Sequence, residues 1–272
     1  MLNPLAATLL PVLAAEEGGF EPPSIDEFFP PIVLFEGTPF ALNRIMIIRL
    51  IVLVAIVLFV LIGTRRLKVV PSRGQSIVEL PFLFVRNNIA EDILGHRDGQ
   101  RFLPLLTTIF FTLLGMNITG VIPLLNIAGS SVIGLAITLA VIVWFVFIYA
   151  GLRKHPGTFL RNSLFPPGVP WPLYLIVTPI EFVSTFILRP ITLTLRLTMN
   201  MLVGHLLLVL FFSATWYFFF QQGPNLFTVF GAATFVLGFG FTLFEIFVAA
   251  LQAYIFTLLT AVYIQLALAE EH

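Results

Sequence analysis

The sequence predicts an all-α integral membrane protein with about five membrane passages. Hydrophobic residues make up 58% of the 272-residue chain and charged residues only 10%, whereas soluble domains usually carry about 25% charged residues. Several apolar runs reach the roughly 20 residues that cross a hydrocarbon core of about 30 Å. Lys and Arg gather in two polar connections, a distribution typical of multi-pass membrane proteins.

The N-terminal part combines an outer segment with the first passage. Residues 1–43 include the acidic, proline-rich stretch GGFEPPSIDEFFPP, and we expect them outside the bilayer as an extracytoplasmic segment. Residues 44–64 form the first expected transmembrane helix, because they are apolar apart from Arg44 and Arg49 near their start. The polar region 65–101 holds seven Lys and Arg residues among weaker apolar patches. This composition predicts a cytoplasmic loop with an interfacial helix.

A helix pair follows over residues 102–152, and its connection around Pro123 and Asn126 contains no charge. Residues 153–172 form a second basic loop. Because both basic regions belong on the cytoplasmic side, the positive-inside rule places the N-terminus outside and the C-terminus in the cytoplasm.

Residues 173–272 are predicted to form a long, tilted helical hairpin joined by the sequence QQGPN. The arm from Leu173 to Phe220, as one helix, would extend about 72 Å, more than twice the hydrocarbon thickness. Two ordinary passages would need a turn near its middle, where no Gly-Pro or Asn-Gly break occurs. The alternative is a steeply tilted pair that lies against a large partner surface inside the bilayer.

Arg196 stands at the centre of this arm. A charge at bilayer depth costs about 2.5–3.5 kcal/mol on insertion scales, so such charges mark ion paths or paired sites. A guanidinium stays protonated and cannot relay protons, so Arg196 suits a gate or a counter-ion; a static pair with a local carboxylate is the alternative. Asn200 lies one turn later on the same face. Arg189, seven residues earlier, could snorkel, pair or take part in function.

The last segment places Glu245, Gln252 and Tyr263 on one helix face, at spacings of seven and eleven residues. Antiparallel pairing about QQGPN brings Gln252 to the depth of Arg196, within about 3 Å, and Glu245 to that of His205, within about 6 Å. A carboxylate beside an imidazole can carry protons at physiological pH. A static buried pair, or a helix-to-helix hydrogen bond from the histidine, would explain the same residues.

Other classes of function find little support. The chain lacks cysteine and the motifs GxxxxGK[ST], GxGxxG, HExxH and GxSxG, so we predict no catalytic residues, no cofactor and no metal site. Its 14 basic and 14 acidic residues balance, which gives no reason to expect nucleic acid as a partner. An ion-coupled secondary transporter with Arg196 as its anion site is an alternative, although such proteins commonly show internal repeats that this chain lacks. A structural scaffold would leave the line from Glu245 to Tyr263 unexplained.

Three blocks resemble the bacterial form of subunit a of the F-type ATP synthase: LPLLTTIFFTLLGMNITGVIP at 103–123, RPITLTLRLTMNMLVGH at 189–205 and LQAYIFTLLTAVYIQLALAEEH at 251–272. The resemblance covers most of the chain from about residue 65. It implies a hairpin that lies along a rotating ring of c subunits, with two offset aqueous half-channels meeting that ring. It implies that the subunit performs no bond chemistry itself and sits in the bacterial plasma membrane, with the c-ring, the b-subunit peripheral stalk, the rest of the ATP synthase and lipids as partners.

By this resemblance, Arg196 faces the ring carboxylate, keeps it deprotonated and blocks proton leakage between the half-channels. The other positions implied in proton translocation are Asn200 and Gln252 beside the arginine, His205 and Glu245 in the outer half-channel, Glu181 in the inner one, and Asn117 in the first block. One departure concerns Thr198-Met199, which stands where the family usually has Phe-Gly. The missing glycine removes a position of close helix approach.

Overall fold

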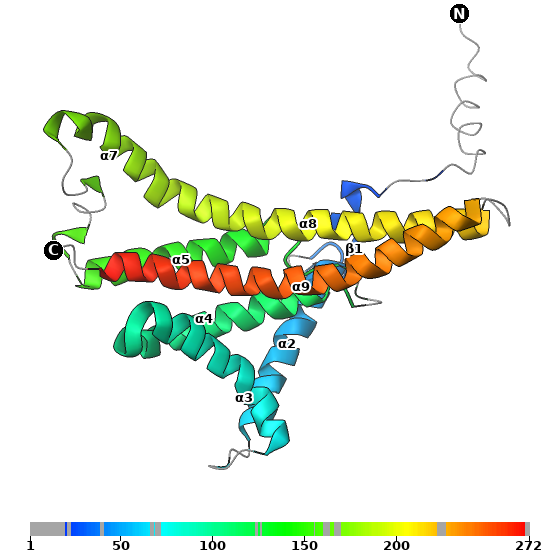
Figure 1. Cartoon of the computed structure of the whole chain (residues 1–272), viewed down its shortest axis with the longest axis horizontal. Helices are drawn as coiled ribbons and strands as arrows, with labels where there is room; N and C mark the ends of the chain where they lie inside the picture. The colour runs from blue at the N-terminus through cyan, green and yellow to red at the C-terminus, as the bar shows by residue number, and fades with distance from the viewer. Residues whose placement is uncertain are drawn as a thin grey trace, which may run out of the picture.

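The computed structural model describes residues 20, 23–38, 41–65, 68, 72–122, 125, 127–154, 156–159, 164–165, 170–221 and 227–269. Within them, five helical runs are long and apolar enough to cross a membrane: Arg44–Thr64, Arg73–Ile118, Ile133–Lys154, Trp171–Gln221 and Thr228–Leu268. The prediction of an all-α membrane protein with about five passages is confirmed. Figure 1 shows the two longest helical arms lying side by side along the long axis of the molecule.

The N-terminal segment contains short elements that lead into the first long helix: the 3₁₀ helix η1 (Ile25–Phe28), the strands β1 (Ile32–Leu34) and β2 (Leu42–Asn43), and α2 (Arg44–Thr64). The two strands pair antiparallel. The Asn43 side chain then accepts a hydrogen bond of 2.9 Å from the Met46 amide, which caps α2. Arg49 Nε donates to the Gly129 carbonyl oxygen at 2.8 Å. The hydrogen bond from Arg49 to Gly129 ties the start of α2 to the connection that follows α4.

The second helical run consists of α3 (Arg73–Val85), the π-helical segment η2 (Arg86–Glu91) and α4 (Asp92–Ile118). Gly95 interrupts it with φ 73°, a left-handed conformation that glycine adopts at little cost. Figure 1 shows α3 and the body of α4 as two helices at an angle. The predicted second passage begins at residue 102, whereas α4 starts upstream at Asp92. Hydropathy detects only the apolar part of a helix, so it does not detect the charged first turns of α4.

The third passage, α5 (Ile133–Lys154), follows a connection held by its own side chains. The Gly129 amide donates to Thr119 Oγ1 at 3.2 Å, and Ser130 Oγ donates to Asn117 Oδ1 at 2.5 Å. The positions singled out in this connection, Pro123 and Asn126, lie outside the described residues.

The first arm of the hairpin is one uninterrupted helical run: η3 (Trp171–Leu173), α7 (Tyr174–Phe182), η4 (Val183–Leu188), α8 (Arg189–Trp216) and η5 (Tyr217–Gln221). Pro179 and Pro190 flank the π-helical η4. Proline has no backbone N–H, so a preceding carbonyl group loses its helical hydrogen bond, and a wider π-helical turn accommodates this change. A turn in the middle, required for two ordinary passages, is therefore absent from residues 171–221. In Figure 1, α7 diverges from α5 and α9 while α8 runs along α9.

The second arm is α9 (Phe227–Leu268). The turn between the arms, residues 222–226, lies outside the described residues. Lys154 Nζ donates to the Leu268 carbonyl oxygen at 2.9 Å, which fixes the end of α5 to the end of α9. The predicted long hairpin is thus present, with two nearly continuous arms.

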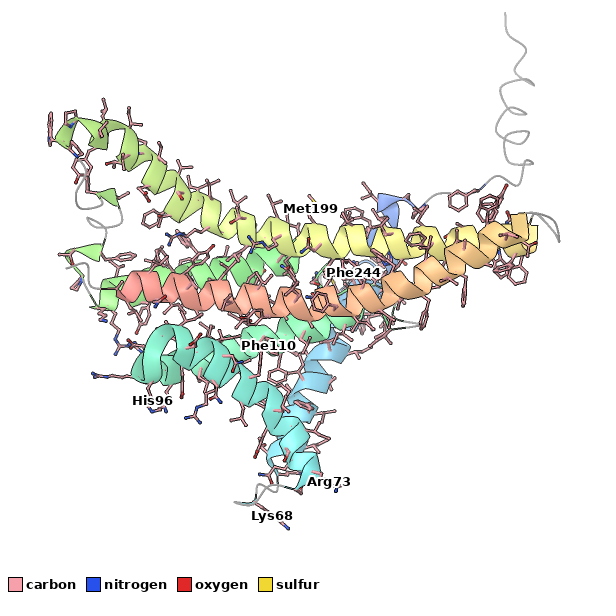
Figure 2. All side chains as sticks on the ribbon, viewed as in Figure 1. Lys68, Arg73, His96, Phe110, Met199 and Phe244 are labelled. Carbon is pink, nitrogen blue, oxygen red and sulfur yellow. The ribbon has the colours of Figure 1, made fainter. Side chains whose placement is uncertain are left out.

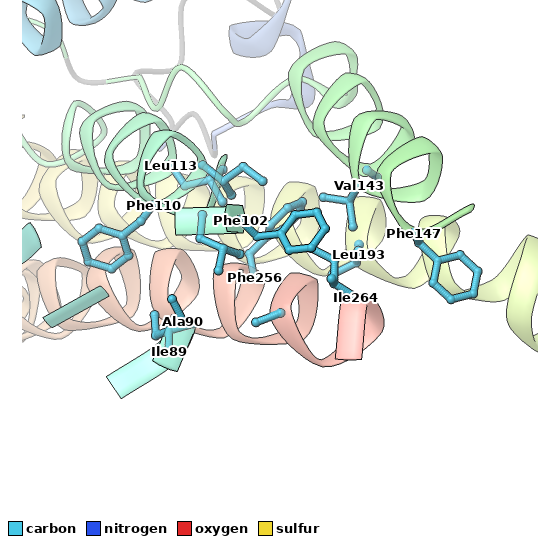
Figure 3. Close-up of a cluster of buried hydrophobic side chains, with 14 of the residues drawn as sticks. Ile89, Ala90, Phe102, Phe110, Leu113, Val143, Phe147, Leu193, Phe256 and Ile264 are labelled. Atoms are coloured by element: carbon cyan, nitrogen blue, oxygen red, sulfur yellow. The ribbon is translucent and has the colours of Figure 1, made fainter. Parts of the chain in front are cut away.

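A hydrophobic core joins α4, α5, α8, α9 and η2. Small residues on α5 and α9 are fully covered and allow close helix approach, which is the main source of packing between helices in lipid: Ala136, Ala140, Ala150, Ala253, Ala261 and Ala267. Figure 3 shows the larger side chains that fill the space between these helices, among them Leu113, Val143, Leu193 and Phe256. This core fixes the rotation of α8 and α9 and so decides which side chains face inward.

Candidate functional site

The helix α8 presents two different faces. Its covered face carries Leu193, Thr194, Leu197, Thr198, Met201, Gly204, His205 and Leu208. The opposite face is exposed and carries Leu195, Arg196, Met199, Asn200 and Val203. This division follows from the helical period of 3.6 residues. Arg196 and His205 therefore lie on opposite sides, as the helical wheel predicts.

Arg196 is exposed on the surface of the chain. Among the described residues, the only ion pairs within 4.0 Å are those of Glu91 with Arg86 and His96, far from Arg196 in the sequence. The local static pair considered from the sequence is thus not formed within the described part of the chain.

Asn200 connects this exposed face to α9. Its Nδ2 donates to Gln252 Oε1 at 3.0 Å, and Gln252 is only 2% exposed. Because Asn200 lies one turn from Arg196, Gln252 lies at the depth that the antiparallel count predicts. The exposed guanidinium and the buried amide therefore belong to one junction between α8 and α9.

Glu245 of α9 is buried between the two arms. It lies beside the part of α8 that carries Gly204 and His205. Its carboxyl group lies directly against Gly204, where a Cβ atom would overlap its oxygens. Both Glu245 and His205 are nearly inaccessible. The carboxyl group of Glu245 thus contacts α8 at the residue that precedes His205.

Arg189 occupies a different environment from Arg196. Its guanidinium lies 5.2 Å from the ring centre of Phe147 on α5 and 5.1 Å from that of Tyr263 on α9, within the range of cation–π attraction. A small pocket adjoins it, lined also by Trp144. The sequence left snorkelling, pairing and a functional role open for Arg189. The structure shows its guanidinium between two aromatic rings, a contact that joins α8, α5 and α9.

The two remaining sequence-predicted positions lie apart from this junction. Asn117 is buried in α4, where its Nδ2 donates to the Ala249 carbonyl oxygen at 3.3 Å and its Oδ1 accepts from Ser130. It therefore links α4, the following connection and α9. Glu181 is half-buried in α7, two turns before Arg189.

Sequence reasoning missed Gly204 and Phe28. Gly204 precedes His205 inside the quoted signature, and a glycine inside an apolar helix can indicate a close approach. Phe28 packs its ring against His205, and it belongs to a proline-rich segment in which no periodic pattern distinguishes it from Phe29. A helical glycine is thus a usable signal, whereas the aromatic contact is not visible in the sequence.

Large apolar side chains are exposed along the stretches of both arms at and near the depth of Arg196. They come from both arms: Leu195, Met199 and Val203 on α8, and Leu243, Phe244, Phe247 and Leu251 on α9. Figure 2 shows Met199 on the side of α8 that faces away from α9. A single cation within so apolar a surface cannot face lipid tails without a cost of about 2.5–3.5 kcal/mol.

Comparisons with known proteins identify the family of this chain. The family described as ATP synthase A chain matches residues 46–265, about four fifths of the chain. The chain is 51% identical over 263 residues to "ATP synthase subunit a" of Rhodococcus erythropolis, covering 96% of this chain and 94% of that protein. It is 38% identical over 262 residues to the protein of the same name from Pseudarthrobacter chlorophenolicus, covering 95% and 97%. A Nocardioides relative of that name is 37% identical over 271 residues, covering 96% and 98%.

The match spans all five helical runs, from α2 to α9. It includes Arg196, Asn200, His205, Glu245 and Gln252. On this extent and these identities, the chain is a multi-pass membrane protein that belongs to the ATP synthase A chain family.

Proposed function

We propose that this protein is the stator subunit of an F-type ATP synthase that passes protons to and from a rotating ring of c subunits. Family membership supports a role in the Fo proton channel in general. The finer proposal comprises two half-channels, a ring carboxylate opposite Arg196, and a peripheral stalk of b subunits that holds the protein still. The subunit itself makes and breaks no covalent bond to phosphate.

One observation carries this proposal: Arg196 is exposed at the middle of a long apolar arm, and no described carboxylate of the chain pairs with it. A permanent cation in that position needs a counter-charge from another molecule. A ring of small apolar subunits, each with one carboxyl group at mid-membrane, supplies both the apolar cover and the negative charge. The exposed side chains Met199 and Phe244 would then contact that ring.

The outer half of the proposed path contains Glu245 and His205. Both groups can accept and release a proton, and both are shielded from bulk solvent between the arms. A proton that arrives from outside would pass between them and reach a ring carboxylate at the level of Asn200. The hydrogen bond between Asn200 and Gln252 holds the two arms in register at that level.

Arg196 separates this outer path from the inner one. Because a guanidinium does not release its proton, it cannot pass protons along the helix. A ring carboxylate that approaches it is stabilised in its ionised form and gives up its proton to the path that leads away. We place Glu181 on the inner path, since it lies on α7 where this helix diverges from α5 and α9 (Figure 1).

The orientation follows from the distribution of basic residues. We propose that the N-terminal segment lies outside and the end of α9 on the cytoplasmic side of the bacterial plasma membrane. The Lys154 ammonium bonded to the Leu268 carbonyl would then mark the cytoplasmic boundary.

Membrane vesicles that contain the whole complex provide the test. Arg196→Ala should abolish proton-driven ATP synthesis while the c subunits still co-purify with the complex. Full retention of synthesis would refute the proposal. Loss of solute uptake with intact synthesis would instead support the transporter alternative. Purification of the wild-type complex should also yield a small, very apolar, carboxylate-bearing partner in many copies.

A further inference from the structure

Phe28 is buried although the segment around it is exposed. It is 3% exposed, whereas Phe29 is 72% exposed, and Ile25 and Phe35 are exposed as well. The helix that carries it, η1, has only four residues. Such a short 3₁₀ turn has little stability of its own, so Phe28 is held in place by tertiary contacts.

The contact partner of Phe28 is His205. The two ring centres lie 5.1 Å apart and the ring planes meet at 75°, an edge-to-face arrangement. His205 is 4% exposed. Edge-to-face pairs have a preferred geometry because the positive edge of one ring meets the negative face of the other. The contact therefore restricts the orientation of the imidazole as well as its access to solvent.

Two side chains from distant parts of the sequence thus meet α8 at consecutive residues. Glu245 of α9 lies against Gly204, and Phe28 of the N-terminal segment lies against His205. In Figure 1 the N-terminal elements lie beside α8. The His205 environment is consequently completed by a segment that precedes the first transmembrane helix.

This segment is anchored on both sides of Phe28. Downstream, β1 pairs with β2, which leads directly into the capped start of α2. Upstream, the Phe20 ring lies 5.9 Å from that of Tyr217, at an interplanar angle of 70°. Tyr217 stands about 18 Å beyond His205 along the helix axis. Phe20 and Phe28 therefore contact the first hairpin arm at two levels, Tyr217 and His205.

We infer that Phe28 is a positioning residue for His205 and that η1, which carries Phe28, forms one wall of the outer proton path. This inference rests on the proposed function. Phe28 itself accepts no proton; it fixes the plane of the imidazole, so that one ring nitrogen stays directed along the path. It also excludes bulk water from the side of the imidazole that it covers.

The test compares substitutions at two neighbouring phenylalanines in the intact complex. Phe28→Leu keeps apolar volume but removes the ring, Phe28→Tyr keeps the ring, and Phe29→Ala is a control at an exposed position of the same segment. Passive proton conductance is measured in vesicles after removal of the soluble sector, normalised to the amount of assembled complex. We expect a fall of roughly two- to tenfold for Phe28→Leu, from the usual energy of an edge-to-face pair, and near-normal conductance for the other two.

Two results would overturn the inference: normal conductance in Phe28→Leu, or an equal fall in Phe29→Ala. Either result leaves the proposed function intact if Arg196→Ala still abolishes proton-driven ATP synthesis in the intact complex. Conversely, full ATP synthesis in Arg196→Ala refutes the proposed function itself.

A second measurement does not depend on activity. Because the chain has no cysteine, the pair Phe20→Cys and Tyr217→Cys can be joined selectively by a short thiol cross-linker added from outside. We expect an intramolecular cross-link in the assembled complex. Its absence, with both thiols shown to be reactive, would contradict the placement of the segment along α8.

Discussion

We expect Gly204→Ala to displace the Glu245 carboxylate without a large change in the stability of the fold. A Cβ atom at residue 204 would overlap the oxygens and carboxyl carbon of Glu245. These atoms form the far end of a flexible side chain, so the carboxyl group can retreat by on the order of 1 Å without moving either helix. Alanine also favours a helix over glycine by about 1 kcal/mol. The two effects on folding oppose one another, and we expect little net change in stability.

Proton transfer should respond far more strongly than stability. Transfer between groups requires a donor and an acceptor within hydrogen-bonding reach, and a displacement of about 1 Å can cost on the order of 100-fold in rate. We therefore expect Gly204→Ala to lower passive proton conductance and ATP synthesis in vesicles by about 10- to 100-fold. The amount of assembled complex and its thermal unfolding temperature should stay close to the wild type.

Gly240→Ala is the matched control, because no atom lies within 4 Å of a Cβ at that helical position. It should leave conductance unchanged and raise stability by up to about 1 kcal/mol, because alanine favours a helix over glycine. The reasoning would be refuted if Gly204→Ala conducts protons like the wild type, since Glu245 would then work from a displaced position. A large loss of assembled complex would also refute it, because the overlap would then be relieved by the helices and not by the side chain.

Three further predictions concern contacts between helices. In a double-mutant cycle of Asn200→Ala and Gln252→Ala, the coupling free energy of unfolding should be about 1 kcal/mol, as for an ordinary hydrogen bond; additive losses in thermal denaturation would contradict the contact. Arg189→Leu should lower stability by about 1–3 kcal/mol because it removes two cation–π contacts, with a smaller loss for Arg189→Lys; an unchanged denaturation midpoint in Arg189→Leu would argue against this clamp. Gly99→Ala places a Cβ 2.7 Å from the Ala90 carbonyl oxygen, and since backbone must move, the loss should be about 1–3 kcal/mol; a stability equal to wild type would show that α4 and η2 are less closely packed.

The relation between sequence and structure is clearest in the hairpin. An α-helix advances 1.5 Å and turns 100° per residue, so counting residues from the turn predicts depth and facing direction. That count places Gln252 beside the Arg196–Asn200 face and Glu245 close to His205. The structure agrees in both cases, with the bond from Asn200 to Gln252 and the contact of Glu245 with Gly204. The missing turn in the first arm likewise follows from its sequence.

Local periodicity does not report contacts between segments that meet only after folding. Gly95 breaks the second helical run with a left-handed φ, which the residues around it do not indicate. The ring pair of Phe28 with His205 depends on how the N-terminal segment crosses the bundle. The sequence of a single chain also contains no information on which exposed face a second molecule covers.

The sequence by itself determined that the protein is a helical membrane protein with a fixed cation midway along a long helical arm, and three sequence blocks indicated its family. Hydropathy and helical period suffice for the fold class, because lipid permits few backbone structures. Only the tertiary structure decided that the cation is exposed and that Glu245 rests on a glycine. It also decided that Arg189 is held by two aromatic rings and that Phe28 closes over His205. These features depend on the rotation and spacing of packed helices, which many small contacts set together and no local pattern encodes.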